Sequence, residues 1–219
     1  MEQANIDFFG ETGLIAGVDE AGRGPLAGPV SAAAVIFPLE LSSFEQLSKQ
    51  KEPIYYLQDS KKLTEKRREE LVPVIKDISL AWSVVFVDHE TIDGINILQA
   101  SLLAMKKAIL ALEICPDKII VDGNKIPHIS KHEFSGQIDS LVKGDSLLPA
   151  ISAASVLAKV ARDQYMVKMH ELHPKYNFKK HKGYPTKEHL AMLTQYGPCP
   201  IHRLSFSPVK AQLKQIKKI

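Results

Sequence analysis

Residues 14–30 read Leu-Ile-Ala-Gly-Val-Asp-Glu-Ala-Gly-Arg-Gly-Pro-Leu-Ala-Gly-Pro-Val, and this stretch decides the predicted fold. The apolar run 14–18 predicts a short buried strand that ends in two adjacent carboxylates, Asp19 and Glu20. A segment rich in glycine and proline follows, and a second apolar run begins at Val30. Two strands joined by so short a turn-rich segment predict an antiparallel hairpin with an acidic tip.

The same segment offers a competing interpretation, because residues 22–27 fit the G-x-G-x-x-A fingerprint of dinucleotide-binding folds. That fingerprint requires a helix after the glycines and a long crossover to a parallel strand. Here Pro25 and Pro29 bracket a short loop and the next apolar strand follows at once. We therefore reject the dinucleotide-binding interpretation.

The two acids at the predicted strand end need a chemical explanation. Side chains alternate along a strand, so Asp19 and Glu20 point apart unless the backbone turns, and we expect the glycines to supply that turn. Two neighbouring carboxylates repel each other unless a cation neutralises them, and oxygen ligands favour Mg²⁺ or Mn²⁺. The alternative is a solvated turn in which the acids have no chemical role.

Composition indicates one globular chain with an uneven charge distribution. The sequence has 219 residues, 45% of them hydrophobic, and no apolar run approaches the roughly 18 residues of a membrane span. Two cysteines, Cys115 and Cys199, make no disulfide framework, so we expect a cytoplasmic protein. Residues 164–219 hold 11 Lys and Arg against 2 acids, whereas residues 1–163 hold 17 against 23. This division predicts a polyanion held by the basic end and a cation held by the acidic body.

Further along the chain, sequence periodicity predicts alternating helices and strands. We expect strands at 80–87, 118–122 and 137–143, and helices at 96–113, 149–169 and 208–219. Thr64 and Thr186 are predicted to cap two more helices, the first kinked or interrupted at Pro73 and the second ending at Gly197.

Two of these strands end in further acids beside glycine. Asp122 follows an apolar run and precedes Gly123, and Asp145 follows Gly144. Active sites of open α/β sheets lie at strand ends, so we expect these acids to join Asp19 and Glu20 in one cluster able to hold two divalent ions. His170 with His173, and Cys199 with His202, have spacings that zinc sites use, but a histidine-rich basic surface explains them more simply.

Several longer motifs, in order, make the chain resemble type 2 ribonuclease H, the bacterial ribonuclease HII family. The resemblance covers nearly the whole chain, and its motifs are residues 17–29, Asp59-Ser-Lys-Lys-Leu, Val121-Asp-Gly-Asn, Val142-Lys-Gly-Asp-Ser, residues 151–163 and His181-Lys-Gly-Tyr-Pro-Thr. Only 18 residues precede Asp19, which favours type 2 over the related type 3 enzymes with their extra N-terminal domain.

The resemblance implies an α/β, ribonuclease H-like fold: a mixed central sheet flanked by helices, with a small helical C-terminal part. We expect residues 1–163 to form the catalytic domain and the basic region 164–219 to pack on it as part of a single-domain enzyme. The implied reaction is metal-dependent hydrolysis of RNA in RNA–DNA hybrids and incision 5′ of single ribonucleotides in duplex DNA, leaving 5′-phosphate and 3′-hydroxyl ends. Two divalent ions, Mn²⁺ or Mg²⁺, are the implied cofactors.

The resemblance also implies roles for individual residues. Asp19, Glu20, Asp122 and Asp145 match the family's catalytic, metal-binding acids. Gly22-Arg23-Gly24 matches the loop that senses the ribose 2′-hydroxyl, and Tyr184 matches the tyrosine that packs on the sugar at the RNA–DNA junction. Basic and hydroxyl side chains near these motifs complete the predicted substrate-binding set: Lys61, Lys143, Ser152, Ser155 and Lys182.

The expected partner is nucleic acid, either an RNA–DNA hybrid or DNA containing ribonucleotides, bound by a monomer with no membrane contact. The resemblance implies a role in DNA replication and ribonucleotide excision repair. The C-terminal segment from Gln212 has no distinctive pattern that would identify it as a binding motif for a sliding clamp. Two other classes stay open: a nucleic-acid-binding module without catalysis, and a DNA nuclease or recombinase-type enzyme of the same broad fold.

Overall fold

The computed structural model describes residues 13–50 and 53–216, and it begins with the predicted hairpin. Strand β1 (Ile15–Ala21) pairs antiparallel with β2 (Val30–Ile36), in a register that runs from Ala16 opposite Ile36 to Ala21 opposite Ser31. The strand therefore continues through Asp19 and Glu20, and the turn at the glycines comes after both acids, so the expectation that it brings them to one side is wrong. The Ser31 hydroxyl, which donates to the Ala21 carbonyl at 3.2 Å, helps to keep this end of the hairpin regular.

The sheet has five strands in the order β3-β2-β1-β4-β5. β3 (Ala81–Val87) pairs antiparallel with β2, whereas β4 (Lys118–Asp122) pairs parallel with β1 and β5 (Gln137–Leu141) pairs parallel with β4. The mixed sheet is thus confirmed. Because β1, β4 and β5 run the same way, their carboxyl ends share one edge, which brings the predicted acids together.

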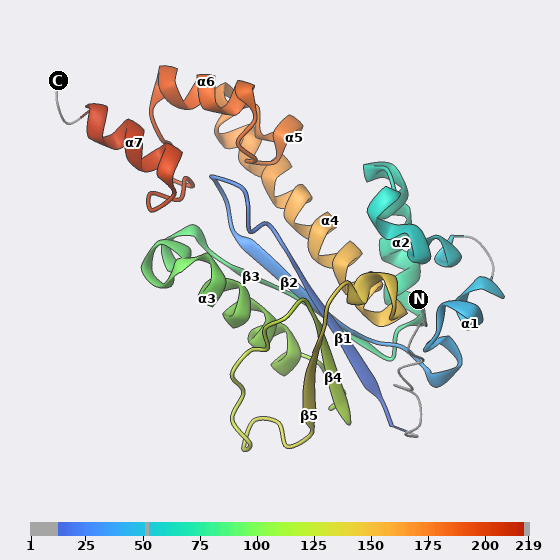
Figure 1. The fold of residues 1–219 in the computed structure, drawn as a ribbon. Helices are drawn as coiled ribbons and strands as arrows, with labels where there is room; N and C mark the ends of the chain where they lie inside the picture. The colour runs from blue at the N-terminus through green and yellow to red at the C-terminus, as the bar shows by residue number, and fades with distance from the viewer. Residues whose placement is uncertain (1–12, 51–52, 217–219) are drawn as a thin grey trace, which may run out of the picture.

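One long helix covers each face of the sheet (Figure 1). α4 (Pro149–Leu172) packs on one face and α3 (His89–Leu110) on the other, so every residue of β2 between them is buried. α4 approaches β1 so closely that a Cβ on Gly17 would lie 2.3 Å from the backbone of Ala150 and Ile151. Small residues at the start of α4 make this close approach of helix and sheet possible.

Helix α2 (Glu65–Ile78) begins as predicted, with the Thr64 hydroxyl accepting the Arg67 N–H at 3.3 Å. It continues through Pro73, contrary to the expected interruption. Pro73 lies on the exposed side, where water can hydrate the carbonyl that the proline leaves without a helical partner. α3 starts earlier than predicted but is kinked at Asn96, whose φ of 67° marks the expected helix start.

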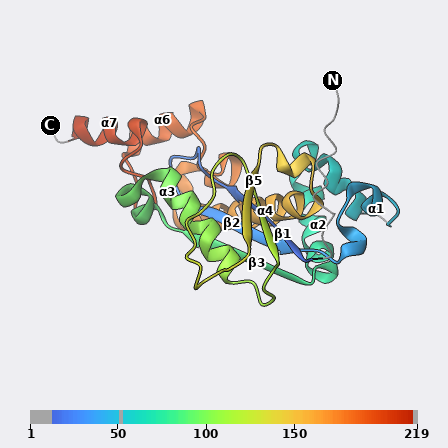
Figure 2. The same ribbon diagram turned by 60° about the horizontal axis from the view of Figure 1, so that its bottom comes forward.

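Helix α4 runs without a break through residue 163, and the C-terminal part of the chain follows it. After α4 come the 3₁₀ turn η4 (Pro174–Tyr176) and helices α5 (Phe178–His181), α6 (Lys187–Tyr196) and α7 (Ser207–Ile216). Helices α6 and α7 lie at the end of the molecule opposite α1 (Phe44–Ser48) in both views (Figures 1 and 2). The remaining short elements are η1 (Leu39–Leu41), η2 (Ile54–Lys62) and η3 (Gly144–Ser146). In the described part of the chain no helix combines the length and apolarity that crossing a bilayer requires.

Candidate active site

Asp19 is the most deeply set of the predicted acids on β1. It is only 7% exposed, and its carboxylate accepts the Glu20 N–H at 2.7 Å and a hydrogen bond from the Ser155 hydroxyl on α4. Burial, followed by the nearby Glu20 charge, raises the pKa of Asp19 well above its ordinary value, and the Asp122 charge adds to the rise. A buried acid whose pKa is raised by the charges of two neighbouring acids is a position that favours a bound cation.

Glu20 is the neighbouring acid, and strand alternation turns it toward the opposite face of the sheet from Asp19. Burial raises the pKa of Glu20, Asp122 raises it further, and Arg23 opposes the rise. The Arg23 guanidinium donates to Glu20 Oε1 at 3.3 Å. The charges of Asp19, Glu20 and Asp122 thus affect one another's pKa values at the strand end, although the strand does not turn between Asp19 and Glu20.

Asp122 lies at the carboxyl end of β4, and Asp145 lies in η3. Oδ1 of Asp122 accepts the backbone N–H of Gly144 at 2.7 Å, which ties the end of β4 to the turn that carries Asp145. Asp145 is 3% exposed. The predicted acids therefore come from two parallel strand ends and the η3 turn that the Asp122–Gly144 hydrogen bond draws toward them.

The donor chemistry of these acids suits a hard divalent cation, but their side chains are not gathered around one point. Within residues 13–50 and 53–216, no three His, Cys, Asp or Glu side chains stand close enough together to hold a metal ion. Two of the carboxylates have other partners, since Glu20 accepts from Arg23 and Asp122 accepts from the Gly144 amide.

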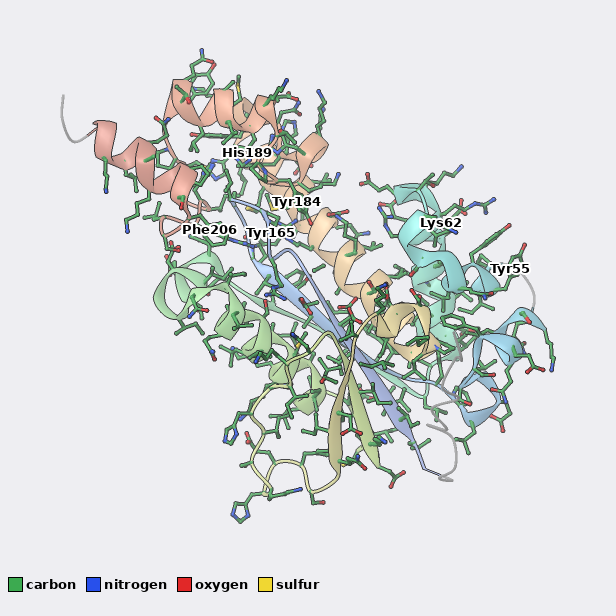
Figure 3. The ribbon with its side chains drawn as sticks, in the orientation of Figure 1. Tyr55, Lys62, Tyr165, Tyr184, His189 and Phe206 are labelled. Atoms are coloured by element: carbon green, nitrogen blue, oxygen red, sulfur yellow. The ribbon has the colours of Figure 1, made fainter. Side chains whose placement is uncertain are left out.

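A pocket lies directly beside Glu20 and contains most of the predicted substrate-binding residues. A Cβ on Gly24 would lie 3.5 Å from the Tyr184 ring, so the glycine loop and the tyrosine are close neighbours in the wall of this pocket. Figure 3 shows Tyr184 beside α4 and His189 beyond it toward α6. The lining residues are Glu20, Ala21, Gly22, Arg23, Gly24, Ser60, Arg68, Ser155, Val156, Lys159 and Tyr184.

Three polar residues of this pocket lie outside the predicted substrate-binding set: Ser60, Arg68 and Lys159. Lys159 follows Ser155 by one helical turn, so helical spacing carried a signal for it. Its ammonium pairs with Asp163 at 2.7 Å and lies 5.6 Å from the Tyr184 ring centroid. Ser60 and Arg68 come from the η2–α2 segment, and only the tertiary fold brings them here.

Four predicted contacts do not line the pocket. Ser152 is fully buried and its hydroxyl donates to the Leu57 carbonyl at 2.6 Å, so we withdraw it from the substrate-binding set. Lys182 is 8% exposed and its ammonium pairs with Glu65 at 2.9 Å. Lys143 is exposed beside η3, in a left-handed conformation with a φ of 59°. The side chain of Lys61 lies outside the described residues.

Two buried histidines of the basic region, His189 and His202, lie in the C-terminal packing next to Tyr184. His202 Nδ1 accepts the Cys199 N–H at 3.0 Å, and His202 Nε2 lies 3.1 Å from His189 Nε2. His189 Nδ1 in turn lies 2.9 Å from the Tyr184 carbonyl oxygen. Burial lowers the pKa of His189 to about 4 and that of His202 to about 3, so both rings are neutral. This chain of contacts fixes the backbone of Tyr184.

Comparison with known proteins finds relatives over nearly the whole chain. A family model described as Ribonuclease HII matches residues 16–209. A ribonuclease HII of Idiomarina loihiensis is 48% identical over 203 residues, covering 93% of this chain and 100% of the relative. One of Endomicrobium trichonymphae is also 48% identical, covering 93% of this chain and 90% of that protein.

Solved structures show the same likeness. The ribonuclease H2 of Pyrococcus horikoshii OT3 superposes with a TM-score of 0.75 at 28% identity, covering 94% of this chain and 100% of that one. A ribonuclease HII of Archaeoglobus fulgidus, solved in complex with PCNA, gives a TM-score of 0.71 at 25% identity, covering 89% and 95%. A Bst-RNase HIII in complex with Mn²⁺, at 18% identity and a TM-score of 0.62, shows likeness of fold alone; it covers 94% of this chain and 71% of that one.

Proposed function

Since this chain belongs to the ribonuclease HII family, we propose that it cuts duplex DNA on the 5′ side of a single embedded ribonucleotide. The family assignment makes it a metal-dependent endonuclease of the ribonuclease H type, which cleaves the RNA strand of RNA–DNA hybrids. The finer specificity is our proposal, and so are the products, a 5′-phosphate and a 3′-hydroxyl.

The observation that carries this proposal is the pocket lined by the Gly22–Gly24 loop and the Tyr184 ring, with Glu20 in its wall. Glycine permits a close backbone approach to one sugar, and a ring packed on the neighbouring deoxyribose would crowd an added hydroxyl. A site built in this way reads one ribose followed by one deoxyribose. The acid cluster next to it then acts on the adjacent phosphodiester.

We assign the metal-binding role to Asp19, Glu20, Asp122 and Asp145. Two divalent cations held there, Mn²⁺ or Mg²⁺, would activate the attacking water and stabilise the departing 3′-oxygen. Ser155 orients the Asp19 carboxylate through its hydroxyl. Lys159, Arg68 and Arg23 supply positive charge to the pocket wall, where they would hold the phosphates on either side of the cut.

The cellular setting follows from this activity. We propose a cytoplasmic, monomeric enzyme of ribonucleotide excision repair and DNA replication. Residues 1–163 would form the catalytic part, and the basic region 164–219 would strengthen binding of the duplex. Lys143, Lys182 and Lys61 stay in the proposal as general phosphate contacts away from the cut.

The test is cleavage of an end-labelled DNA duplex that carries one ribonucleotide, with Mg²⁺, Mn²⁺ or EDTA. An all-DNA duplex and a long RNA–DNA hybrid run beside it. We expect one metal-dependent cut 5′ of the ribonucleotide, cleavage of the hybrid and none of the all-DNA duplex. Cleavage of the hybrid alone would refute the finer specificity, cleavage of all-DNA would favour the DNA nuclease class, and binding without any cleavage would favour a binding module.

A further inference from the structure

Two fully buried arginines lie under the glycine loop. Arg162 on α4 and Arg203, between α6 and α7, are both 0% exposed. A buried guanidinium is costly unless hydrogen bonds satisfy it, and here the bonds go to backbone carbonyls. Arg162 donates to the carbonyls of Ala27, Pro29 and Lys182, at 3.1, 3.0 and 3.0 Å.

Arg203 binds both ends of the same loop. Its Nη2 donates to the Gly22 carbonyl at 2.6 Å and to that of Pro29 at 3.0 Å. Its Nη1 donates to the Arg23 carbonyl at 3.0 Å, and its Nε to that of Gly28 at 2.9 Å. One rigid guanidinium fork therefore fixes the two peptide planes at the tip of the loop relative to its return strand.

The backbone of Arg203 is held as well. Its N–H donates to the Leu26 carbonyl at 2.8 Å, within the loop. On the other side, the Asp93 carboxylate on α3 accepts the N–H groups of Leu204 and Ser205 at 2.7 and 2.9 Å. The backbone on both sides of Arg203 is thus held in place, and Arg203 links the loop to α3.

The consequence for the pocket follows from peptide geometry. In a trans peptide the C=O and the next N–H point in opposite directions. Because the carbonyls of Gly22 and Arg23 point inward to Arg203, the N–H groups of Arg23 and Gly24 point away from it, and residues 22–24 line the pocket. We propose that Arg203 is a positioning residue that aims these two N–H groups at a sugar hydroxyl of the bound strand, and so sets selectivity for a ribonucleotide. This inference rests on the proposed function.

The test compares Arg203→Lys with Arg162→Lys, which is the same substitution at an equally buried site whose carbonyl partners lie outside residues 22–24. Fluorescence anisotropy in Ca²⁺ gives the Kd for a duplex with one ribonucleotide and for the matching all-DNA duplex. The readout is the ratio of the two constants, which a general loss of stability does not change. We expect Arg203→Lys to lower this ratio by about fivefold to tenfold, the scale of one lost hydrogen bond, and Arg162→Lys to leave it within about twofold.

Equal ratios for wild type and Arg203→Lys, or equal losses in the two variants, would overturn the inference. If the wild type neither prefers nor cuts the ribonucleotide duplex, the proposed function itself has failed, which is a different result. Should Arg203→Lys not fold, Asp93→Ala replaces it, because it loosens the backbone after Arg203 without touching the guanidinium. It should lower the ratio in the same direction, and an unchanged ratio there would also refute the positioning role.

Discussion

The backbone N–H of Gly144 donates a hydrogen bond of 2.7 Å to Oδ1 of Asp122. This contact joins the end of β4 to the turn that carries Asp145, across 22 residues of chain. It also orients the carboxylate of Asp122 before any cation binds. Gly144 therefore helps to position the acids through its backbone, although it has no side chain to contribute.

Gly144→Ala tests this role. The added Cβ would lie 2.6 Å from Ile151 Cδ1 and 3.3 Å from Asp122 Oδ1, so the Ile151 side chain must shift and the Asp122 carboxylate must give by a few tenths of an ångström. We expect a loss of stability of about 1–3 kcal/mol from overpacking, and a fall in kcat of at least about tenfold. Thermal unfolding and hybrid cleavage measure the two effects. Gly94→Ala is the matched control, because a Cβ there meets nothing within 4 Å; an active, stable Gly144→Ala would refute the argument.

Asp19→Asn should separate stability from activity. Burial and the Glu20 charge raise the pKa of Asp19, so the ionised form is disfavoured in the folded state. The associated stability is complete at low pH and is lost as the pH rises through the raised pKa. In EDTA at neutral pH we therefore expect Asp19→Asn to raise the melting temperature while abolishing cleavage.

Divalent metal sharpens this comparison. Mn²⁺ should raise the melting temperature of the wild type much more than that of Asp19→Asn, because the cation binds the ionised carboxylate. Asp77→Asn, at an exposed position on α2, serves as the control and should change neither property. Cleavage at the wild-type rate by Asp19→Asn, or a lower melting temperature for it in EDTA, would contradict the prediction.

Tyr184→Ala should affect substrates unequally. This residue is 38% exposed and its ring lies beside Gly24 in the pocket wall. Loss of ring packing on one sugar is worth about 1–3 kcal/mol, so we expect kcat/KM for the single-ribonucleotide duplex to fall about tenfold or more. A long hybrid should lose less, because it offers many binding registers. Tyr196→Ala, a tyrosine with 44% exposure on α6, is the control; equal losses on both substrates would rule out junction recognition by Tyr184.

The hairpin and the shared strand edge were predictable because they depend on local signals. Pro25 and Pro29 leave no room for a crossover, and the apolar runs before Asp19 and Asp122 end where the acids begin. The course of the chain after Asp19 was predicted wrongly because it depends on pairing between distant segments. β1 continues past Asp19 because β2 stays in register with it as far as Ser31, which no local pattern reveals.

The serines of α4 illustrate a second limit. Ser152 and Ser155 lie in the same small-residue stretch of sequence, with similar neighbours. Ser152 nevertheless donates to the Leu57 carbonyl in the core, whereas Ser155 donates to Asp19. Only the rotation of the helix on the sheet distinguishes them. The buried arginines are a third case, because a guanidinium that binds backbone carbonyls needs no particular side chain as a partner. The ion pair of Lys182 with Glu65 of a distant helix is likewise invisible in the local sequence.

The neutral histidines next to Tyr184 predict a loss of stability in mild acid. With their pKa values lowered to about 4 and about 3, His189 and His202 stay unprotonated when folded, whereas in the unfolded chain they take up protons below about pH 6.5. Their contribution to stability is thus present above pH 6.5 and is lost as the pH falls, by about 2 kcal/mol for each ring at pH 5. Melting temperatures from pH 7.5 to 5 should fall steeply in the wild type.

His202→Asn should make that fall shallower. The variant removes one of the two rings that resist protonation, and an asparagine oxygen still offers an acceptor to the Cys199 N–H that His202 Nδ1 accepts at 3.0 Å. It should be less stable than the wild type at pH 7.5, because the contact with His189 is gone, yet it should lose less on acidification. His128→Gln, at an exposed loop position, should follow the wild-type curve. Parallel curves for the wild type and His202→Asn would show that the buried rings do not resist protonation, and that some other group governs unfolding in acid.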